Sequence, residues 1–178
     1  MSEEIVADGT VAENQTQISN LWSCREGIAE ALNHWGGVYK YDLSLPLPQL
    51  YSLVEKTRDR MTEAGLLGDT DDHPVVEVVG YGHMGDSNLH LNIPVRRFDK
   101  KVEQILEPWV YEQVQALNGS ISAEHGLGIA KKDFIGYSRS DTMIGLMKAV
   151  KNLYDPVGLP CLATNLTTEA NYENRTAS

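Results

Sequence analysis

Cysteine and long apolar runs are both scarce in this sequence of 178 residues. The two cysteines, Cys24 and Cys161, lie far apart and match no metal-binding spacing, which argues against a disulfide framework and against a zinc finger. No apolar run approaches the length that spans a bilayer, so we expect no membrane span. The N-terminal residues are acidic and lack the arginine-rich character of a transit peptide, so we expect no targeting sequence in this chain.

Basic residues are also few. The chain has 15 Lys and Arg against 25 Asp and Glu, which gives a net charge of −10. This balance argues against nucleic acid and against an anionic membrane surface as partners, because both attract basic patches. An anionic small molecule would have to be met by local positive charge. The length suits one domain with a sizeable core.

The most informative stretch is GYGHMGDSNLHLN, residues 80–92. Apolar, β-rich runs at 75–81 and 89–95 flank it and are typical of strands. Between them, the turn-forming residues 85–88 indicate a hairpin loop. The stretch is therefore predicted to form two adjacent antiparallel strands.

The expected register of this hairpin brings two histidines together. If Asp86 and Ser87 are the two turn residues, His83 faces His90, with Cβ atoms about 4.5–5.5 Å apart. Asn92 lies on the same face as His90, because strand side chains repeat every two residues. A lone histidine here would most simply be a polar loop residue, but two in register beside a third polar side chain favour a site.

The rest of the chain alternates between helical and extended patterns. Apolar residues at helical spacing predict helices at 17–33, 48–65, 100–117 and 140–154, and Pro108 is expected to kink or break the third. The β-rich runs predict strands at 38–45, 75–81, 89–95 and 120–124. Residues 1–16 are predicted to form an irregular start, and residues 159–178 a poorly ordered tail.

From residue 38 to 124 the element order is β-α-β-β-α-β, that of the split-βαβ or ferredoxin-like unit. We therefore expect an α+β fold: an antiparallel sheet with helices on one face, plus flanking N- and C-terminal helices. Strands one and three are expected to run in one direction, and strands two and four in the other. The ends of strands two and four and the beginnings of one and three then share one edge, which holds His83, His90, Glu124 and Lys40.

This edge has the composition of a metal site. Two imidazoles and a carboxylate, those of His83, His90 and Glu124, are a common ligand set for Zn²⁺ or a similar divalent ion and leave positions open for substrate. A metal held in this way lowers the pKa of a coordinated hydroxyl. His125, next to Glu124, is the candidate base for the released proton.

Two cations are candidates to hold a substrate carboxylate. They are Lys40 and, if the first helix packs over this edge, Arg25, which can form two parallel hydrogen bonds. The resulting hypothesis is a 2-hydroxy acid bound by a metal and cations. Its oxidation also needs a hydride acceptor, and we find no dinucleotide fingerprint, that is, no G-x-G-x-x-G followed by its acidic partner.

Two segments, residues 81–92 (YGHMGDSNLHLN) and 120–128 (SISAEHGLG), closely resemble signatures of FAD-linked 2-hydroxy-acid dehydrogenases, in the vanillyl-alcohol oxidase-type superfamily. Further similar segments are 38–45, 131–138 and 155–158. The best likeness is to the D-2-hydroxyglutarate dehydrogenase branch, which overlaps with fungal mitochondrial D-lactate dehydrogenases. The resemblance covers residues 6–158.

The resemblance implies that residues 17–158 form a C-terminal substrate- and metal-binding domain. FAD would be bound mainly by an N-terminal domain that is absent from this chain, and no FAD-binding residue is assigned. A mitochondrial location and a homodimer of the full-length protein are compatible with it. The implied roles are metal ligands for His83, His90 and Glu124, catalytic base for His125, and substrate contacts for Arg25, Lys40 and Asn92.

The sequence departs from the family pattern at two places. Ser87 stands where the family usually has glycine, which changes the turn but spares the ligands. After Gly158 the polar tail replaces the usual ending of the family.

The sequence is compatible with three functions. The first is the substrate domain of an FAD-dependent D-2-hydroxy-acid dehydrogenase that oxidises D-2-hydroxyglutarate or D-lactate to the 2-oxo acid, with the isolated chain inactive. The second is an inactive metal-binding fragment. The third is a small metal-dependent hydrolase, which needs neither a flavin nor a second domain.

Overall fold

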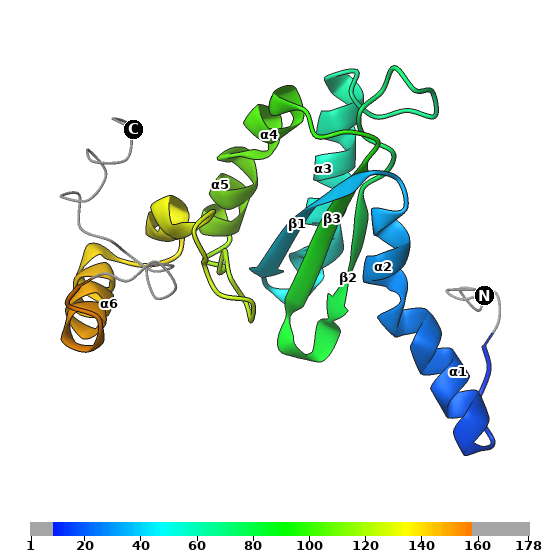
Figure 1. The fold of residues 1–178 in the computed structure, drawn as a ribbon, viewed down its shortest axis with the longest axis horizontal. Helices are drawn as coiled ribbons and strands as arrows, with labels where there is room; N and C mark the ends of the chain where they lie inside the picture. Colours follow the sequence, from blue (N-terminus) through cyan, green and yellow to red (C-terminus); the bar gives the residue numbers. More distant parts are fainter. Residues whose placement is uncertain (1–8, 158–178) are drawn as a thin grey trace.

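The computed structural model describes residues 9–157 of the chain. The tail predicted at 159–178 and residues 1–8 of the predicted irregular start lie outside this part. Within it, a small sheet lies at the centre and helices extend from both of its sides (Figure 1). The predicted α+β class is confirmed.

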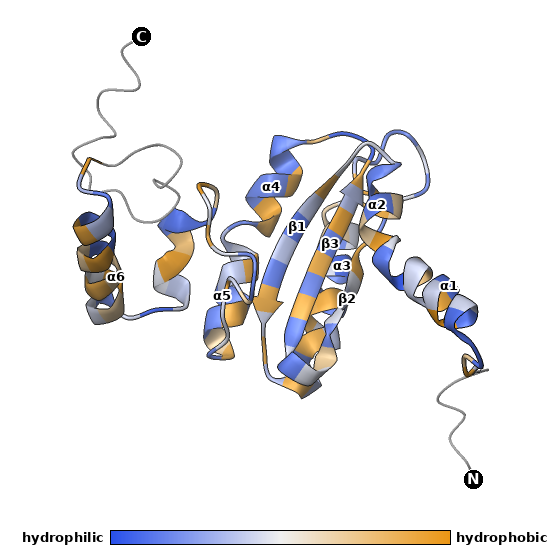
Figure 2. Cartoon of the chain, turned by 60° about the horizontal axis from the view of Figure 1, so that its bottom comes forward, coloured by the Kyte–Doolittle hydropathy of each residue, from blue (hydrophilic) through white to orange (hydrophobic). Residues whose placement is uncertain are grey.

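The sheet has three antiparallel strands in the order β1–β3–β2. They are β1 (Gly37–Ser44), β2 (Val79–His83) and β3 (Asn88–Val95). Polar and apolar residues alternate along β1 and β3, as the banding in Figure 2 shows. Because alternate side chains point to opposite faces, the sheet has an apolar face and a polar face. The predicted hairpin between β2 and β3 is confirmed.

The strand directions differ from the expectation. β1 is antiparallel to β3, with Gly37 opposite Val95 and Ser44 opposite Asn88. Since β2 is also antiparallel to β3, β1 and β2 run the same way, and the prediction that strands one and three run together was wrong. The end of β1, not its beginning, therefore lies beside the hairpin loop.

The strand expected at 120–124 is reduced to a single bridge between Ser44 and Ser120. The hydroxyl of Ser120 donates to the carbonyl of Ser122 at 2.9 Å. The Asp42 carboxylate accepts hydrogen bonds from the backbone N–H groups of Glu124 and His125. These side chain–backbone bonds compete with a regular ladder. The segment therefore follows β1 without forming a fourth strand.

Six α-helices lie in the described residues: α1 (Gln15–Glu26), α2 (Ile28–Asn33), α3 (Leu50–Glu63), α4 (Lys100–Leu106), α5 (Trp109–Ala116) and α6 (Asp141–Tyr154). Three 3-10 turns accompany them: η1 (Leu47–Gln49), η2 (Met84–Asp86) and η3 (Lys132–Tyr137). The helix predicted at 17–33 is divided at Gly27, and the predicted break at Pro108 is confirmed. None of the helices in residues 9–157 is long and apolar enough to cross a membrane.

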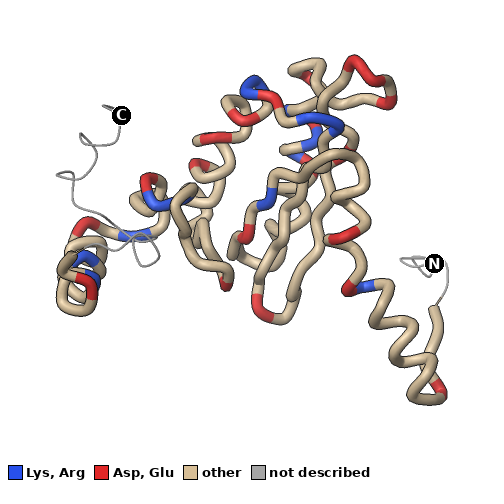
Figure 3. Tube along the Cα trace, in the orientation of Figure 1, with Lys and Arg blue, Asp and Glu red and all other residues tan. Residues whose placement is uncertain are grey.

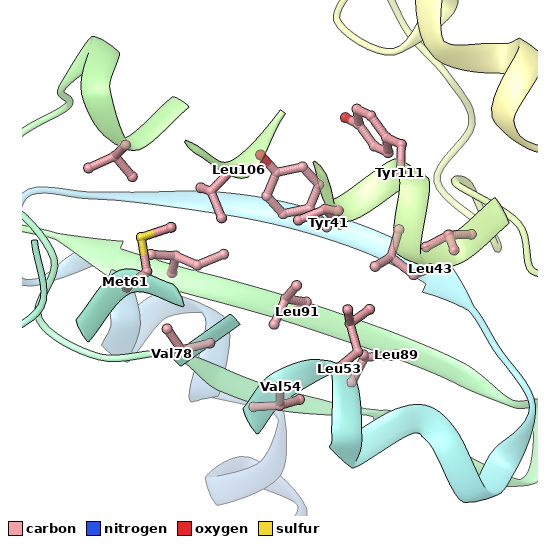
Figure 4. Close-up of a cluster of buried hydrophobic side chains, with 14 of the residues drawn as sticks. Tyr41, Leu43, Leu53, Val54, Met61, Val78, Leu89, Leu91, Leu106 and Tyr111 are labelled. Carbon is pink, nitrogen blue, oxygen red and sulfur yellow. The ribbon is translucent and has the colours of Figure 1, made fainter. Parts of the chain in front are cut away.

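The core fills the space between the apolar face of the sheet and α3, α4 and α5 (Figure 4). From α3 it takes residues at helical spacing, namely Leu50, Leu53, Val54, Thr57 and Met61. The strands contribute Tyr41, Leu43, Leu89 and Leu91. Each fully buried large apolar side chain contributes about 1.5–3 kcal/mol. This packing fixes which face of the sheet points inward and leaves the other face to polar side chains.

Candidate metal and substrate site

The candidate site lies on the polar face of the sheet, at the end where the hairpin loop begins. His90 and Asn92 point to this face because they alternate with the buried Leu89, Leu91 and Ile93 of β3. The same alternation places Asp42 of β1 on this face, opposite His90.

The hairpin register differs from the prediction by two residues. His83 lies opposite Asn88, and Tyr81 lies opposite His90. The reason is the loop, in which η2 and the left-handed Ser87, at φ 54°, make a connection longer than the two residues expected. A shift of two residues keeps each side chain on its face. The rings of His83 and His90 therefore still meet, with centroids 5.3 Å apart.

Three histidines surround one oxygen of Glu124. Glu124 Oε1 lies 3.3 Å from the Nε2 atom of His90, and 3.6 Å from those of His83 and His125. His90 and His125 are stacked, with centroids 5.3 Å apart and ring planes 11° apart. The side chain of His90 is only 12% exposed, whereas that of His125 is 61% exposed. The expected proximity of His83, His90 and Glu124 is confirmed.

Asp42 is the residue that sequence reasoning missed. Its Oδ2 accepts hydrogen bonds from the backbone N–H groups of Glu124 and His125, both at 2.8 Å. Its Oδ1 lies 3.5 Å from His90 Nδ1. Asp42 would have been found from the correct direction of β1, which brings the C-terminal half of that strand to the hairpin end of the sheet.

The environment sets the charge of two of these groups. Burial lowers the pKa of His90, and the nearby carboxylates of Asp42 and Glu124 oppose this without reversing it. Burial by itself raises the pKa of Asp42, but the hydrogen bonds from the His125 and Glu124 backbone, together with the nearby His125 and Lys131 side chains, leave that pKa below its ordinary value. Asp42 is thus an anion and His90 a neutral imidazole near pH 7, which is the form that binds metals.

The three predicted substrate contacts, Asn92, Lys40 and Arg25, differ in where they lie relative to the histidines. Asn92 is buried and its amide donates to the His90 carbonyl at 3.0 Å. Lys40 is exposed and lies opposite Asn92, two residues before Asp42. The prediction placed Lys40 at the same edge as His83, His90 and Glu124, but in the structure it lies outside this histidine cluster.

Arg25 reaches the polar face through Tyr81. Its guanidinium lies 4.9 Å from the centroid of the Tyr81 ring, and that ring contacts His90 at a centroid distance of 5.4 Å. Arg25 was a candidate only if the first helix packs over this edge, and its contact with Tyr81 brings it to the polar face. Four other basic residues, Arg96, Arg97, Lys100 and Lys101, lie where β3 ends and α4 begins, away from the hairpin loop (Figure 3).

The donor atoms have the spacing of a metal site. In a tetrahedral zinc centre with bonds of about 2.0–2.2 Å, neighbouring ligand atoms are about 3.4 Å apart. The distances of 3.3–3.6 Å around Glu124 Oε1 match this value and exceed those of ordinary hydrogen bonds. One ligand atom each from Asp42, His90, Glu124 and His125 also lie within 4.8 Å of one another. The residues present therefore fit a divalent ion.

Comparisons with known proteins cover all the candidate residues. Residues 1–159 match the family model described as FAD linked oxidases, C-terminal domain. The chain is 60% identical over 160 residues to a Schizosaccharomyces pombe protein provisionally named a mitochondrial D-lactate dehydrogenase, covering 89% of this chain and 30% of that protein.

Two further relatives are named for D-2-hydroxyglutarate. The D-2-hydroxyglutarate–pyruvate transhydrogenase of Saccharomyces cerevisiae is 47% identical over 156 residues, which is 88% of this chain and 31% of that protein. The mitochondrial D-2-hydroxyglutarate dehydrogenase of Arabidopsis thaliana is 45% identical over 159 residues, which is 89% of this chain and 26% of that protein. The chain thus spans less than a third of the length of these relatives.

Proposed function

Because this chain belongs to the family of C-terminal domains of FAD-linked oxidases, we propose that it is the substrate- and metal-binding part of an FAD-dependent D-2-hydroxy-acid dehydrogenase. The substrate is D-2-hydroxyglutarate or D-lactate, and the product is the 2-oxo acid. The relatives' names supply the substrate class. The observation that carries the proposal is the set of three imidazole nitrogens around one oxygen of Glu124. The relatives' names favour this function over a metal-dependent hydrolase.

The metal ligands in this proposal are His83, His90 and Glu124. Their support is the spacing of 3.3–3.6 Å between the imidazole nitrogens and the carboxylate oxygen. A bound Zn²⁺ or similar ion would polarise the substrate hydroxyl and lower its pKa. His83 and Glu124 are about half exposed, which leaves this side of the cluster accessible to a substrate.

His125 is the proposed base. Its ring is held against His90 by stacking, and its backbone is fixed by the hydrogen bond to Asp42. The exposed imidazole can take the hydroxyl proton on a ring nitrogen. Because the ring is anchored on one side only, it can contact the substrate from the other.

The substrate carboxylates are proposed to be held by Arg25 and Lys40, with Asn92 as a further contact. Arg25 is supported by its place over Tyr81, and Lys40 by its place on the polar face opposite Asn92. D-2-hydroxyglutarate carries two carboxylates and D-lactate one. Two cations at different positions around the histidines therefore suit the dicarboxylate better.

The hydride acceptor in this proposal is FAD. We propose that it is held mainly by the part of the longer proteins that the matched segment does not cover, which is more than two thirds of the named relatives. The relatives named mitochondrial support a mitochondrial location. A homodimer of the longer protein stays an expectation from the resemblance.

Metal analysis tests the site directly. The wild type should retain about one Zn²⁺ per chain after dialysis, and His83→Ala and His90→Ala should retain far less, because each loses a ligand. His34→Ala is the matched control, since His34 is an exposed histidine at the end of α2, outside the cluster. Equal metal content in all four proteins would refute the ligand assignment.

A further inference from the structure

Asp42 carries a buried carboxylate whose two oxygens have different surroundings. The residue is only 2% exposed. A carboxylate removed from water is costly unless hydrogen bonds or opposite charges compensate it. Two backbone N–H groups satisfy Oδ2, whereas Oδ1 is buried and has no hydrogen-bond partner among the described residues.

The first contact of Asp42 holds the segment that carries Glu124 and His125. Besides the two bonds to Oδ2, the Asp42 carbonyl accepts the N–H of Ala123 at 3.2 Å. Three consecutive peptide groups therefore bond to one residue. These bonds stand in for the ladder that the segment does not form with β1, and so they set where the Glu124 carboxylate lies.

The second contact concerns His90. Its Nδ1 is also buried without a hydrogen-bond partner among residues 9–157, and Asp42 Oδ1 faces it at 3.5 Å. An ionised carboxylate can only accept a hydrogen bond. A neutral imidazole facing it is stabilised with its proton on Nδ1, which leaves the lone pair of Nε2 directed toward Glu124.

We propose that Asp42 is a positioning residue that keeps His90 in the tautomer able to bind a metal through Nε2 and, with its other oxygen, holds Glu124 in place. This inference rests on the metal site proposed above. Groups that orient metal ligands in this way typically change metal affinity by 10–100-fold when removed.

The variant Asp42→Asn separates this role from a purely structural one. The amide oxygen can replace Oδ2 and accept the two backbone N–H groups, so the segment stays held. The amide NH₂ then faces His90 Nδ1 as a donor, which favours the tautomer with the proton on Nε2 and blocks the metal. The opposite amide orientation would point NH₂ at two N–H donors and is disfavoured.

Two measurements on the full chain test the proposal: Zn²⁺ affinity by competition with a chromophoric chelator, and the His90 tautomer by ¹⁵N NMR of the metal-free protein. The wild type should show Nδ1–H at His90, and Asp42→Asn should show Nε2–H and bind Zn²⁺ about 10–100-fold more weakly. Asp86→Asn is the control, because it removes the same charge from the exposed hairpin loop.

The outcomes distinguish the two proposals. If the wild type shows the Nε2–H tautomer at His90, the proposed role of Asp42 is refuted, and this measurement does not require the variant to fold. The role is also refuted if a folded Asp42→Asn binds Zn²⁺ with the affinity of the wild type. A wild type that binds no Zn²⁺ but shows Nδ1–H at His90 refutes the metal site while supporting the orientation of His90 by Asp42.

Discussion

Replacing Ser87 by glycine is expected to stabilise the protein. Ser87 has φ 54° and ψ 29°, in the left-handed region. This conformation costs an L-residue about 1–2 kcal/mol, because its Cβ crowds the following carbonyl. Glycine avoids that cost but loses more conformational freedom on folding, by about 0.5–1 kcal/mol. From the middle of each range, the net gain in the free energy of unfolding is about 0.75 kcal/mol.

The bonds that hold Ser87 are kept in the variant. Its N–H donates to the Met84 carbonyl, and its own carbonyl accepts from the Leu45 N–H, both at 3.1 Å. Since both bonds are made by the backbone, glycine can form them equally well. Ser87→Ala is the matched control, because it removes the hydroxyl and keeps the Cβ that crowds the turn.

Thermal unfolding of the metal-free chain is the assay. For a protein of this size, 1 kcal/mol corresponds to about 2–4 °C in Tm, so Ser87→Gly should raise Tm by about 1–4 °C and Ser87→Ala should not. Urea unfolding should show a higher midpoint with an unchanged slope. An unchanged midpoint in Ser87→Gly, or an equal rise in Ser87→Ala, would refute the attribution to backbone strain.

Three further outcomes are expected. Burial raises the pKa of Asp42, but its backbone hydrogen bonds and the nearby His125 and Lys131 lower it more, to below the ordinary 3.8. The contribution of Asp42 to stability is therefore present above that pH and lost as the pH falls below it. The free energy of unfolding in urea should accordingly fall less steeply at acid pH in Asp42→Asn than in the wild type. Tyr81→Leu, which removes the ring beneath Arg25, should weaken D-2-hydroxyglutarate binding by about 0.5–2 kcal/mol in calorimetry, and Tyr81→Phe should not. The 178-residue chain with added FAD and D-2-hydroxyglutarate should not reduce an electron-accepting dye. A flavin that the protein does not orient loses about 7–11 kcal/mol of barrier lowering. Robust dye reduction would contradict the proposal that FAD is held elsewhere.

The elements with strong local signals were predictable from the sequence. The final helix, predicted at 140–154, is α6 (Asp141–Tyr154), capped by Ser140 as its sequence indicates. The break at Pro108 follows from the missing N–H of proline. In contrast, Gly27 interrupts a helical pattern whose apolar spacing gave no sign of an end.

The hairpin register could not be read from the turn residues alone. The turn-forming residues 85–88 indicated a hairpin but not the length of its loop, and the prediction took Asp86 and Ser87 as a two-residue turn. The glycine that the family usually has at position 87 suits the positive φ found there, but Asp-Gly is also typical of a two-residue turn, so it would not have corrected the register. The histidine cluster was still predicted correctly, because an error of two residues leaves the alternation of faces unchanged.

The error in the direction of β1 had the larger consequence. The alternation of polar and apolar residues is the same for either direction of a strand, so it could not reveal this error. Reversing a strand keeps its polar face but exchanges its ends, and this exchange put Lys40 in the histidine cluster in place of Asp42. The two residues have opposite charges, so the error also changed the electrostatics of the site. A site with Lys40 attracts an organic acid by itself. A site with Asp42 and Glu124 attracts a divalent cation and repels the acid as long as no cation is bound. In the proposed function, a metal held by His83, His90 and Glu124 would supply the positive charge that an anionic substrate needs at this site, and Arg25 and Lys40 would act from its periphery.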